Sequence, residues 1–238
     1  MKRRDLLLMG AAAGGGVLSG LVSVWANGRA RAFVFVPSDE KSMNIEKTLA
    51  GATDSIEFTV FGRAKDLEQS VRQSNPEIVI APEPTLRDLN LSPTLLGRRA
   101  GSTTEPYVLI TVDQPAAPKS MQPHTVGVLG IMDHSSMKRH CGELLGTGEQ
   151  KVKTVTKYAD LLPLLQFKAA QGVVLPKRFS GTLTSRSALK LISNDIPDGR
   201  VGLTSVAIQN QQVKVSAIDQ LRRLNGAAMA ALGVEDWQ

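Results

Sequence analysis

The chain has 238 residues, carries 28 Lys and Arg against 22 Asp and Glu, and is 42% hydrophobic but only 4% aromatic. This apolar fraction argues against a disordered chain and a membrane protein with many spans, and one cysteine excludes a scaffold of internal disulfide bonds. Part of the net charge of +6 lies in residues 2–4, and the remainder is too scattered to indicate nucleic-acid binding.

The first residues have the order of an export signal. Residues 2–8 read KRRDLLL, and a mildly hydrophobic stretch rich in Ala and Gly follows. The arginine pair resembles the twin-arginine signal, which implies export to the periplasm. Small residues allow cleavage after Ala26 or Ala32, and we favour Ala26, so that residues 1–26 are a signal peptide. The alternative is an uncleaved anchor, because residues 6–24 approach the roughly 20 residues that span a bilayer.

The first half of the mature chain alternates strand-like and helix-like segments. Apolar runs and period-two alternation predict strands, and apolar residues at i, i+4 predict helices. The predicted order is strand 32–36, helix 43–52, strand 56–61, helix 64–74 and strand 77–81. This βαβαβ order predicts a parallel sheet with helices on its faces, and ligands of such sheets gather at the carboxyl ends of the strands.

The second half repeats this plan after an interruption. Extended segments are predicted at 94–99 and 107–112, and the stretch 114–123 has three prolines and is typical of a linker. Beyond it, strands and helices alternate again. The predicted strands are 125–129, 153–155, 172–175, 189–193 and 201–208, with a turn at 194–200, and the predicted helices are 135–145, 158–170 and 216–232.

This order of elements resembles the type II periplasmic solute-binding proteins. The phrases EIVIAP at 77–82, YVLIT at 107–111, TVGV at 125–128 and IP at 196–197 are similar to those of the phosphate/phosphonate-binding branch. The resemblance implies an α/β fold of two lobes, each a mainly parallel sheet flanked by helices.

Under this resemblance, residues 31–107 and 206–238 form the first lobe and residues 108–205 the second. The segments 107–112 and 201–208 are then crossing hinge strands. In such a fold a few hinge residues absorb the rotation while each lobe moves as a body.

The resemblance also implies a function. We expect an exported protein that captures a small anionic or zwitterionic solute between its lobes, with a phosphate- or phosphonate-like oxyanion favoured. Its partners are then a membrane permease of an ABC-type transporter, or a sensor kinase or cyclase, and the chain is a monomer. We expect no enzyme activity, no cofactor and no nucleic acid. The alternative is a periplasmic enzyme or an accessory factor in assembly built on the same scaffold.

Serines at strand ends are candidates for the ligand site. Ser38 follows the first strand, and Ser135 and Ser136 lie where a strand leads into a helix. Hydroxyls and free N–H groups at such points can hold an oxyanion. The alternative for all three is ordinary helix capping or a turn.

Three further candidates lie at predicted strand ends. Glu83 can pair with the amine of a zwitterion, or it is an acidic first-turn residue favoured by the helix dipole. Thr85 lies at the same edge. Arg178 offers a bidentate guanidinium group for a carboxylate or phosphate, with simple hydration as the alternative.

Motifs for metal binding and catalysis are absent from the sequence. His124, His134, His140 and Cys141 lack the i, i+4 or C-x-x-C spacing of a strong metal site, so we expect no metal. The chain has no P-loop, no G-x-S-x-G and no G-x-G-x-x-G. The adjacent residues 133–135 supply Asp, His and Ser, but neighbours on one loop cannot align as a catalytic triad.

Overall fold

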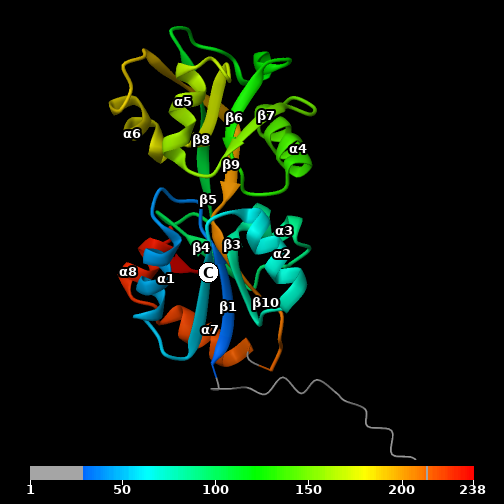
Figure 1. The fold of residues 1–238 in the computed structure, drawn as a ribbon, viewed down its shortest axis with the longest axis vertical. Helices are drawn as coiled ribbons and strands as arrows, with labels where there is room; N and C mark the ends of the chain where they lie inside the picture. Colours follow the sequence, from blue (N-terminus) through cyan, green and yellow to red (C-terminus); the bar gives the residue numbers. More distant parts are fainter. Residues whose placement is uncertain (1–28, 213) are drawn as a thin grey trace, which may run out of the picture.

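A computed structural model describes residues 29–212 and 214–238, which form two mixed sheets flanked by helices (Figure 1). The signal peptide assigned to residues 1–26 lies outside the described residues. Ala32, the second cleavage point considered, is fully buried in the middle of strand β1 (Ala30–Phe35), so cleavage there would remove half of that strand. Within the described part of the chain, no helix has both the length and the apolar character needed to cross a membrane.

The first sheet has six strands in the order β11-β4-β10-β3-β1-β2. Strand β1 pairs in parallel with its two neighbours, and the other pairs are antiparallel. The remaining strands are β2 (Ile56–Phe61), β3 (Ile78–Pro82), β4 (Leu95–Arg98), β10 (Thr204–Ile208) and β11 (Asp236–Trp237).

Helices cover both faces of this sheet, so every residue of its central strands β3 and β10 is buried. Helices α1 (Ser42–Ala50), α7 (Lys214–Arg222) and α8 (Gly226–Ala231) pack on one face, in a core that includes Leu49 and Leu221. Helices α2 (Ala64–Ser74) and α3 (Glu83–Asp88) supply buried residues to a separate core on the other face. Period-two alternation places successive side chains of a strand in these two different cores.

The second sheet has five strands in the order β7-β6-β8-β5-β9. Strand β6 pairs in parallel with β7 and β8, and β5 pairs antiparallel with β8 and β9. The strands are β5 (Thr104–Val112), β6 (Thr125–Leu129), β7 (Lys151–Val155), β8 (Gly172–Pro176) and β9 (Leu191–Gly202). The helices are α4 (His134–Leu145), α5 (Leu161–Gln166) and α6 (Ser180–Ser185), with short 3-10 segments η1 (Pro118–Met121), η2 (Tyr158–Asp160) and η3 (Lys177–Phe179).

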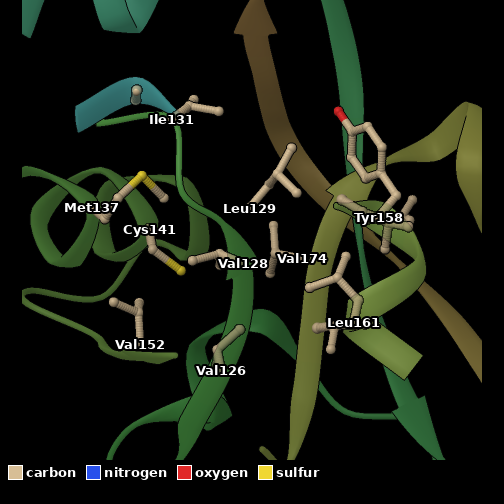
Figure 2. Packing of buried hydrophobic residues seen from close by; sticks show 14 of the residues in the cluster. Val126, Val128, Leu129, Ile131, Met137, Cys141, Val152, Tyr158, Leu161 and Val174 are labelled. Atoms are coloured by element: carbon tan, nitrogen blue, oxygen red, sulfur yellow. The ribbon is translucent and has the colours of Figure 1, made fainter. Parts of the chain in front are cut away.

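The core of the second sheet is mainly aliphatic. Met137 and Cys141 of α4 face the buried valines of β6 from one side, and Leu161 of α5 lies beside Val174 on the other (Figure 2). Each of these side chains is at least nine-tenths buried. The packed sheet and its helices therefore hold the strand ends that face the first sheet.

Some predicted elements differ from the observed ones. The predicted turn at 194–200 falls inside the 12-residue strand β9, whose pairing with β5 is interrupted only at residues 196–199, where Asp198 has a φ of 57°. The predicted helix 158–170 is only the segment η2 followed by the short α5. The predicted helix 216–232 is divided, because the side chain of Asn225 accepts from the backbone N–H of Ala228 and caps a new helix, α8.

Within residues 29–212 and 214–238, the chain passes between the two sheets at two points. Residues 99–103 lead from β4 to β5, and Leu203 joins β9 to β10. These two crossings are tied together, since the N–H of Leu203 donates to the carbonyl of Thr103 at 2.9 Å. The predicted α/β architecture of two lobes is confirmed, with mixed sheets because the crossing strands add antiparallel pairs.

Candidate functional site

A cavity of about 220 Å³ lies where the two lobes meet, and we call it the cleft cavity. Its walls come from the carboxyl ends of β1, β3 and β8, from β5, and from the crossing at Leu203. Carboxyl ends of strands are the usual ligand edge of an α/β sheet. The lining side chains with polar groups include Ser38, Glu105, Tyr107, Tyr158, Arg178 and Thr204.

The cleft cavity contains an ion pair between Arg178 and Glu105. The Nε of Arg178 donates to Oε2 of Glu105 at 2.6 Å, and Nη2 donates to Oε1 at 3.4 Å. The guanidinium group also lies over the ring of Phe179, 4.2 Å from its centroid. These contacts fix the position of Arg178 while 36% of its side chain stays exposed, so the cation remains accessible to a ligand.

Two tyrosines form an aromatic wall of the same cavity. The ring of Tyr158 stacks on Phe179, with centroids 4.0 Å apart, and its hydroxyl points away from Leu161 and Val174 (Figure 2). Tyr107 lies on β5 opposite Pro176 of β8. Burial raises the pKa of both phenols, so both hydroxyls are neutral donors at neutral pH.

Arg99 borders the cleft cavity from the first lobe. Its Nη2 lies 3.9 Å from the point where a Cβ on Gly233, a residue of the cavity wall, would be. Burial lowers the pKa of this guanidinium, and the positive charge of Arg178 lowers it further. Arginine nevertheless stays protonated in proteins, so two cations face this region of the cleft.

A second, larger cavity of about 540 Å³ lies beside α3 and α4, and we call it the side cavity. Its charged groups are largely paired within the protein. Arg87 pairs with Glu83, and Arg200 donates to the hydroxyl of Thr104 at 2.8 Å and its carbonyl at 2.7 Å. A ligand here would have to displace these contacts, which makes the cleft cavity the better candidate.

Asp133 caps the amino end of α4. Its Oδ1 accepts from the N–H of Ser135 at 2.7 Å and from that of Ser136 at 3.2 Å. Hydrogen bonds from Ser135, whose hydroxyl donates to Oδ1 at 2.6 Å, and then from Ser136 hold the pKa of Asp133 well below its usual range. The backbone donors that a ligand would need are therefore occupied by this carboxylate.

Direct contacts join the two lobes around the cleft. The hydroxyl of Ser136 donates to Oδ1 of Asp88 at 2.6 Å, which links α4 to α3. On the other side of the cleft, Oδ1 of Asp39 accepts from the N–H of Ala159 at 3.1 Å, and Arg186 lies 3.9 Å from the same carboxylate. The two lobes are therefore held close together in this conformation.

The structure distributes the six predicted ligand residues over several places. Ser38 and Arg178 lie together at the cleft cavity, whereas Glu83 and Ser136 line the side cavity. Thr85 is buried and donates to a carbonyl of the other lobe, and Ser135 is exposed beside its cap. The hydroxyl of Ser38 accepts from the N–H of Glu40 at 3.0 Å, which is the turn contact weighed as its alternative role.

Several cleft residues were not singled out by sequence reasoning. No ligand-binding motif surrounds these residues in the sequence, and their neighbouring residues share no pattern. They are Arg99, Glu105, Tyr107 and Tyr158. Their position in the chain could have indicated three of them, because Arg99, Glu105 and Tyr107 lie within nine residues of one another around the crossing from β4 to β5. Within the described residues, no three His, Cys, Asp or Glu side chains converge as metal ligands would.

Comparisons with known proteins show the fold. No family model matches the chain, and no curated protein matches it. XAC2383 from Xanthomonas citri, solved bound to ATP, is 11% identical, with a TM-score of 0.61 over 89% of this chain and 91% of that chain. Arginine-bound ArgBP from T. maritima is 12% identical, with a TM-score of 0.52 over 87% and 98%.

A third similar structure is the VFT2 domain of BvgS from Bordetella pertussis. It is 13% identical, with a TM-score of 0.54 over 87% of this chain and 93% of that one. Identities this low are evidence of shared architecture alone. The chain has the two-lobed α/β fold of the periplasmic-binding-protein and Venus flytrap domains.

Proposed function

We propose that this chain is an exported solute-binding protein that captures a small anionic or zwitterionic solute in the cleft cavity. The observation that carries this proposal is Arg178, a cation fixed by Glu105 and Phe179 yet accessible in a cavity between two lobes. A guanidinium group matches the geometry of a carboxylate, phosphate or phosphonate.

The size of the cavity supports a small ligand. A volume of about 220 Å³ is below the roughly 300 to 1,000 Å³ of pockets that enclose drug-sized molecules. Its mixture of charged groups, hydroxyls and aromatic rings suits a compact polar solute. The ion pair of Arg178 with Glu105 also offers a carboxylate to the amine of a zwitterion.

The fold supplies a means of opening. In the described part of the chain, the backbone joins the lobes through residues 99–103 and Leu203, so rotation about these crossings would separate the walls of the cleft. The contacts that close it are a few hydrogen bonds and one long ion pair, whose groups become hydrated once the lobes separate. The bound solute would be enclosed by closure and released by opening.

Similar structures support a binding role. The names of two of them state a bound small molecule, ATP for XAC2383 and arginine for ArgBP. We propose that this chain, as a monomer outside the cytoplasm, passes its solute to an ABC-type permease or reports it to a membrane sensor such as a kinase or cyclase. A phosphate- or phosphonate-like oxyanion is the favoured ligand.

A thermal-shift screen tests the proposal. The panel is phosphate, methylphosphonate, sulfate, thiosulfate, organic acids and amino acids, and a ligand at 100 times its Kd should add about 2.7 kcal/mol of stability. Arg178→Gln should abolish the shift. Lys177→Gln is the matched control, because Lys177 is the adjacent cation but pairs with Asp195 at 2.8 Å and does not line the cavity.

Two results would contradict the proposal. One is a panel in which no compound raises the melting temperature of the wild-type protein. The other is an equal loss of binding in Lys177→Gln and Arg178→Gln, which would point to a general effect of charge. Conversion of a bound compound to product would favour the alternative of a periplasmic enzyme.

A further inference from the structure

Three polar groups around the cleft cavity have no hydrogen-bond partner among residues 29–212 and 214–238. They are the guanidinium group of Arg99 and the hydroxyls of Tyr107 and Tyr158. Tyr158 is only 6% exposed, and neither hydroxyl oxygen is sealed from the cavity. Polar groups that are largely buried are nearly always hydrogen-bonded, so donors at the edge of a cavity that have no partner in the protein are available to a ligand.

A tight turn fixes the position of Arg99. Its backbone N–H donates to the carbonyl of Ser102 at 2.9 Å, and the N–H of Ser102 donates back at 3.0 Å. The two residues between them, Ala100 and Gly101, have φ values of 48° and 75°. Both lie in the left-handed region that a two-residue hairpin of type I′ requires, which is unfavourable for alanine.

A carboxylate holds this turn in place. Oε2 of Glu235 accepts from the N–H of Ala100 at 2.8 Å, and the N–H of Glu235 donates to the carbonyl of Arg98 at 2.7 Å. The turn is therefore anchored to the segment that follows α8, the same segment that supplies Gly233 to the cavity wall. Local strain stabilised from outside is frequent at binding sites.

The tyrosines are placed by equally specific features. The pairing of β5 with β9 shifts register between Pro106 and Val108, so Tyr107 lies opposite a bulge formed by residues 196–199 of β9. Bulges re-aim side chains and are common beside functional sites. Tyr158 is held by its stack on Phe179, whose ring also lies beneath Arg178.

We propose that Arg99, together with the hydroxyls of Tyr107 and Tyr158, forms an oxyanion subsite at the border of the cleft cavity that Gly233 lines. The ligand would then carry a group with two or more anionic oxygens, such as a carboxylate, phosphate or phosphonate. This inference rests on the proposed function, and it deepens that function by naming the donors from both lobes and the chemical group they bind.

The arrangement selects an oxyanion for two reasons. Guanidinium forks and phenolic hydroxyls donate along fixed directions, so several separate oxygens satisfy them better than a spherical halide ion. Arg99 belongs to the first lobe, whereas Tyr158 and Arg178 belong to the second. An oxyanion bound to both sides favours the closed conformation, because only that conformation brings the donors together.

The test compares variants by isothermal titration calorimetry with inorganic phosphate, methylphosphonate and glutamate as probes, and sodium chloride as the halide control. The variants are Arg99→Gln, Arg99→Lys, Tyr158→Phe and Arg178→Gln. Arg98→Gln is the matched control, since Arg98 is the adjacent arginine but pairs with Asp236 at 2.6 Å outside the cavity. Cooperative unfolding of each variant by circular dichroism confirms that it is folded.

The expected result is a Kd for the bound probe that rises about 10- to 100-fold in Arg99→Gln, as expected for a hydrogen bond to a charged group. Arg99→Lys should recover part of this loss, and Tyr158→Phe should weaken binding several-fold. Arg98→Gln and chloride should leave binding unchanged. If the protein binds phosphate or methylphosphonate more tightly than glutamate, the group that the subsite recognises is a phosphoryl group. If it binds glutamate more tightly, that group is a carboxylate.

Failure of the inference is distinguishable from failure of the proposed function. If a probe binds the wild-type protein and Arg178→Gln abolishes binding, but Arg99→Gln and Tyr158→Phe bind it normally, the subsite is wrong and solute capture stands. Unchanged binding in all variants would place the ligand elsewhere. If no probe binds the wild-type protein, the subsite and the oxyanion proposal both fail.

Discussion

The hydroxyl of Thr85 in α3 donates to the carbonyl of Ile131 beyond β6 at 2.7 Å, so that one buried hydrogen bond joins the two lobes across the cleft. Thr85 is 3% exposed and Ile131 is 5% exposed, which removes water as an immediate replacement. This contact therefore contributes to the closed conformation, and it borders the cleft cavity, which Ile131 lines.

Replacing Thr85 by Val should shift the protein towards the open conformation. The variant keeps the shape of the side chain but leaves the carbonyl of Ile131 without its donor, at a cost of about 1 to 3 kcal/mol in the closed state. Small-angle X-ray scattering of the ligand-free protein should show a larger radius of gyration. Thr48→Val is the control, because its hydroxyl donates to Asn44 within α1. An unchanged radius in both variants would mean that this bond does not hold the lobes together.

Removal of the cap of α4 should destabilise the protein in a pH-dependent manner. Since hydrogen bonds from Ser135 and Ser136 depress the pKa of Asp133 in the folded state, its carboxylate stabilises the fold at any pH above the unfolded value of about 3.9. That contribution is lost as the pH falls from this value towards the lower folded pKa. Asp133→Ala should cost about 1 kcal/mol at pH 7, as for other helix caps.

Urea denaturation of Asp133→Ala and the wild-type protein at pH 7 and at pH 3 measures this effect. The difference in unfolding free energy should be largest at pH 7 and smaller at pH 3. Asp54→Ala serves as control, because the side chain of Asp54 is 98% exposed and caps no helix. A difference between Asp133→Ala and wild type that grows on acidification would contradict the sign of the pKa shift.

Replacement of either of two helical glycines by alanine should change the stability of the protein, in opposite directions for the two positions. A Cβ on Gly142 of α4 would lie 1.6 Å from the carbonyl oxygen of Gly148, because the chain turns back over the helix after Gly146. A Cβ on Gly181 of α6 would meet nothing within 4 Å. Gly142→Ala should therefore destabilise the protein by about 1 to 3 kcal/mol through overpacking, whereas Gly181→Ala should stabilise it by up to about 1 kcal/mol through helix propensity.

Chemical denaturation of the two glycine variants and the wild-type protein measures the change in unfolding free energy for each substitution. Similar shifts in the two would show that the loop at Gly148 moves freely away from α4. If Gly142→Ala is destabilised and its m-value is unchanged, the loss of stability comes from poorer packing in the native state.

The strands and helices of the first lobe were predictable because their signals are local. Residues 56–61 alternate apolar and polar side chains, and the observed β2 has the same bounds with alternating burial. The predicted helix 64–74 matches α2 for the same reason. Patterns within one element need no knowledge of its partners.

The features that were mispredicted depend on distant pairing. Residues 194–200 contain Asn, Asp, Pro and Gly, a composition typical of turns, yet pairing with β5 on both sides confines the irregularity to residues 196–199 within one strand. The candidate site depends on the same effect. Arg99 and Tyr158 are 59 positions apart in the chain and approach each other only because β4, β5 and η2 meet between the lobes.

Cys141 should be unreactive in the folded protein. Its side chain is 1% exposed in the core of the second lobe, and burial raises the pKa of its thiol to about 12. At pH 8 the folded protein therefore contains almost no thiolate, which is the reactive form, and reagents have no access to it. Ellman's reagent should label the native protein very slowly and the protein in 6 M guanidinium chloride at once.

This reactivity also reports on the second lobe specifically, because the thiol lies between α4 and the sheet strand β6. Gly142→Ala, which disturbs the adjacent residue of α4, should accelerate labelling, whereas Gly181→Ala and Thr85→Val should not. Rapid labelling of the wild-type protein under native conditions would mean that α4 separates from the sheet readily, contrary to its close packing around Cys141. Equal acceleration by Thr85→Val would indicate that opening of the cleft, rather than loosening of α4, exposes the thiol.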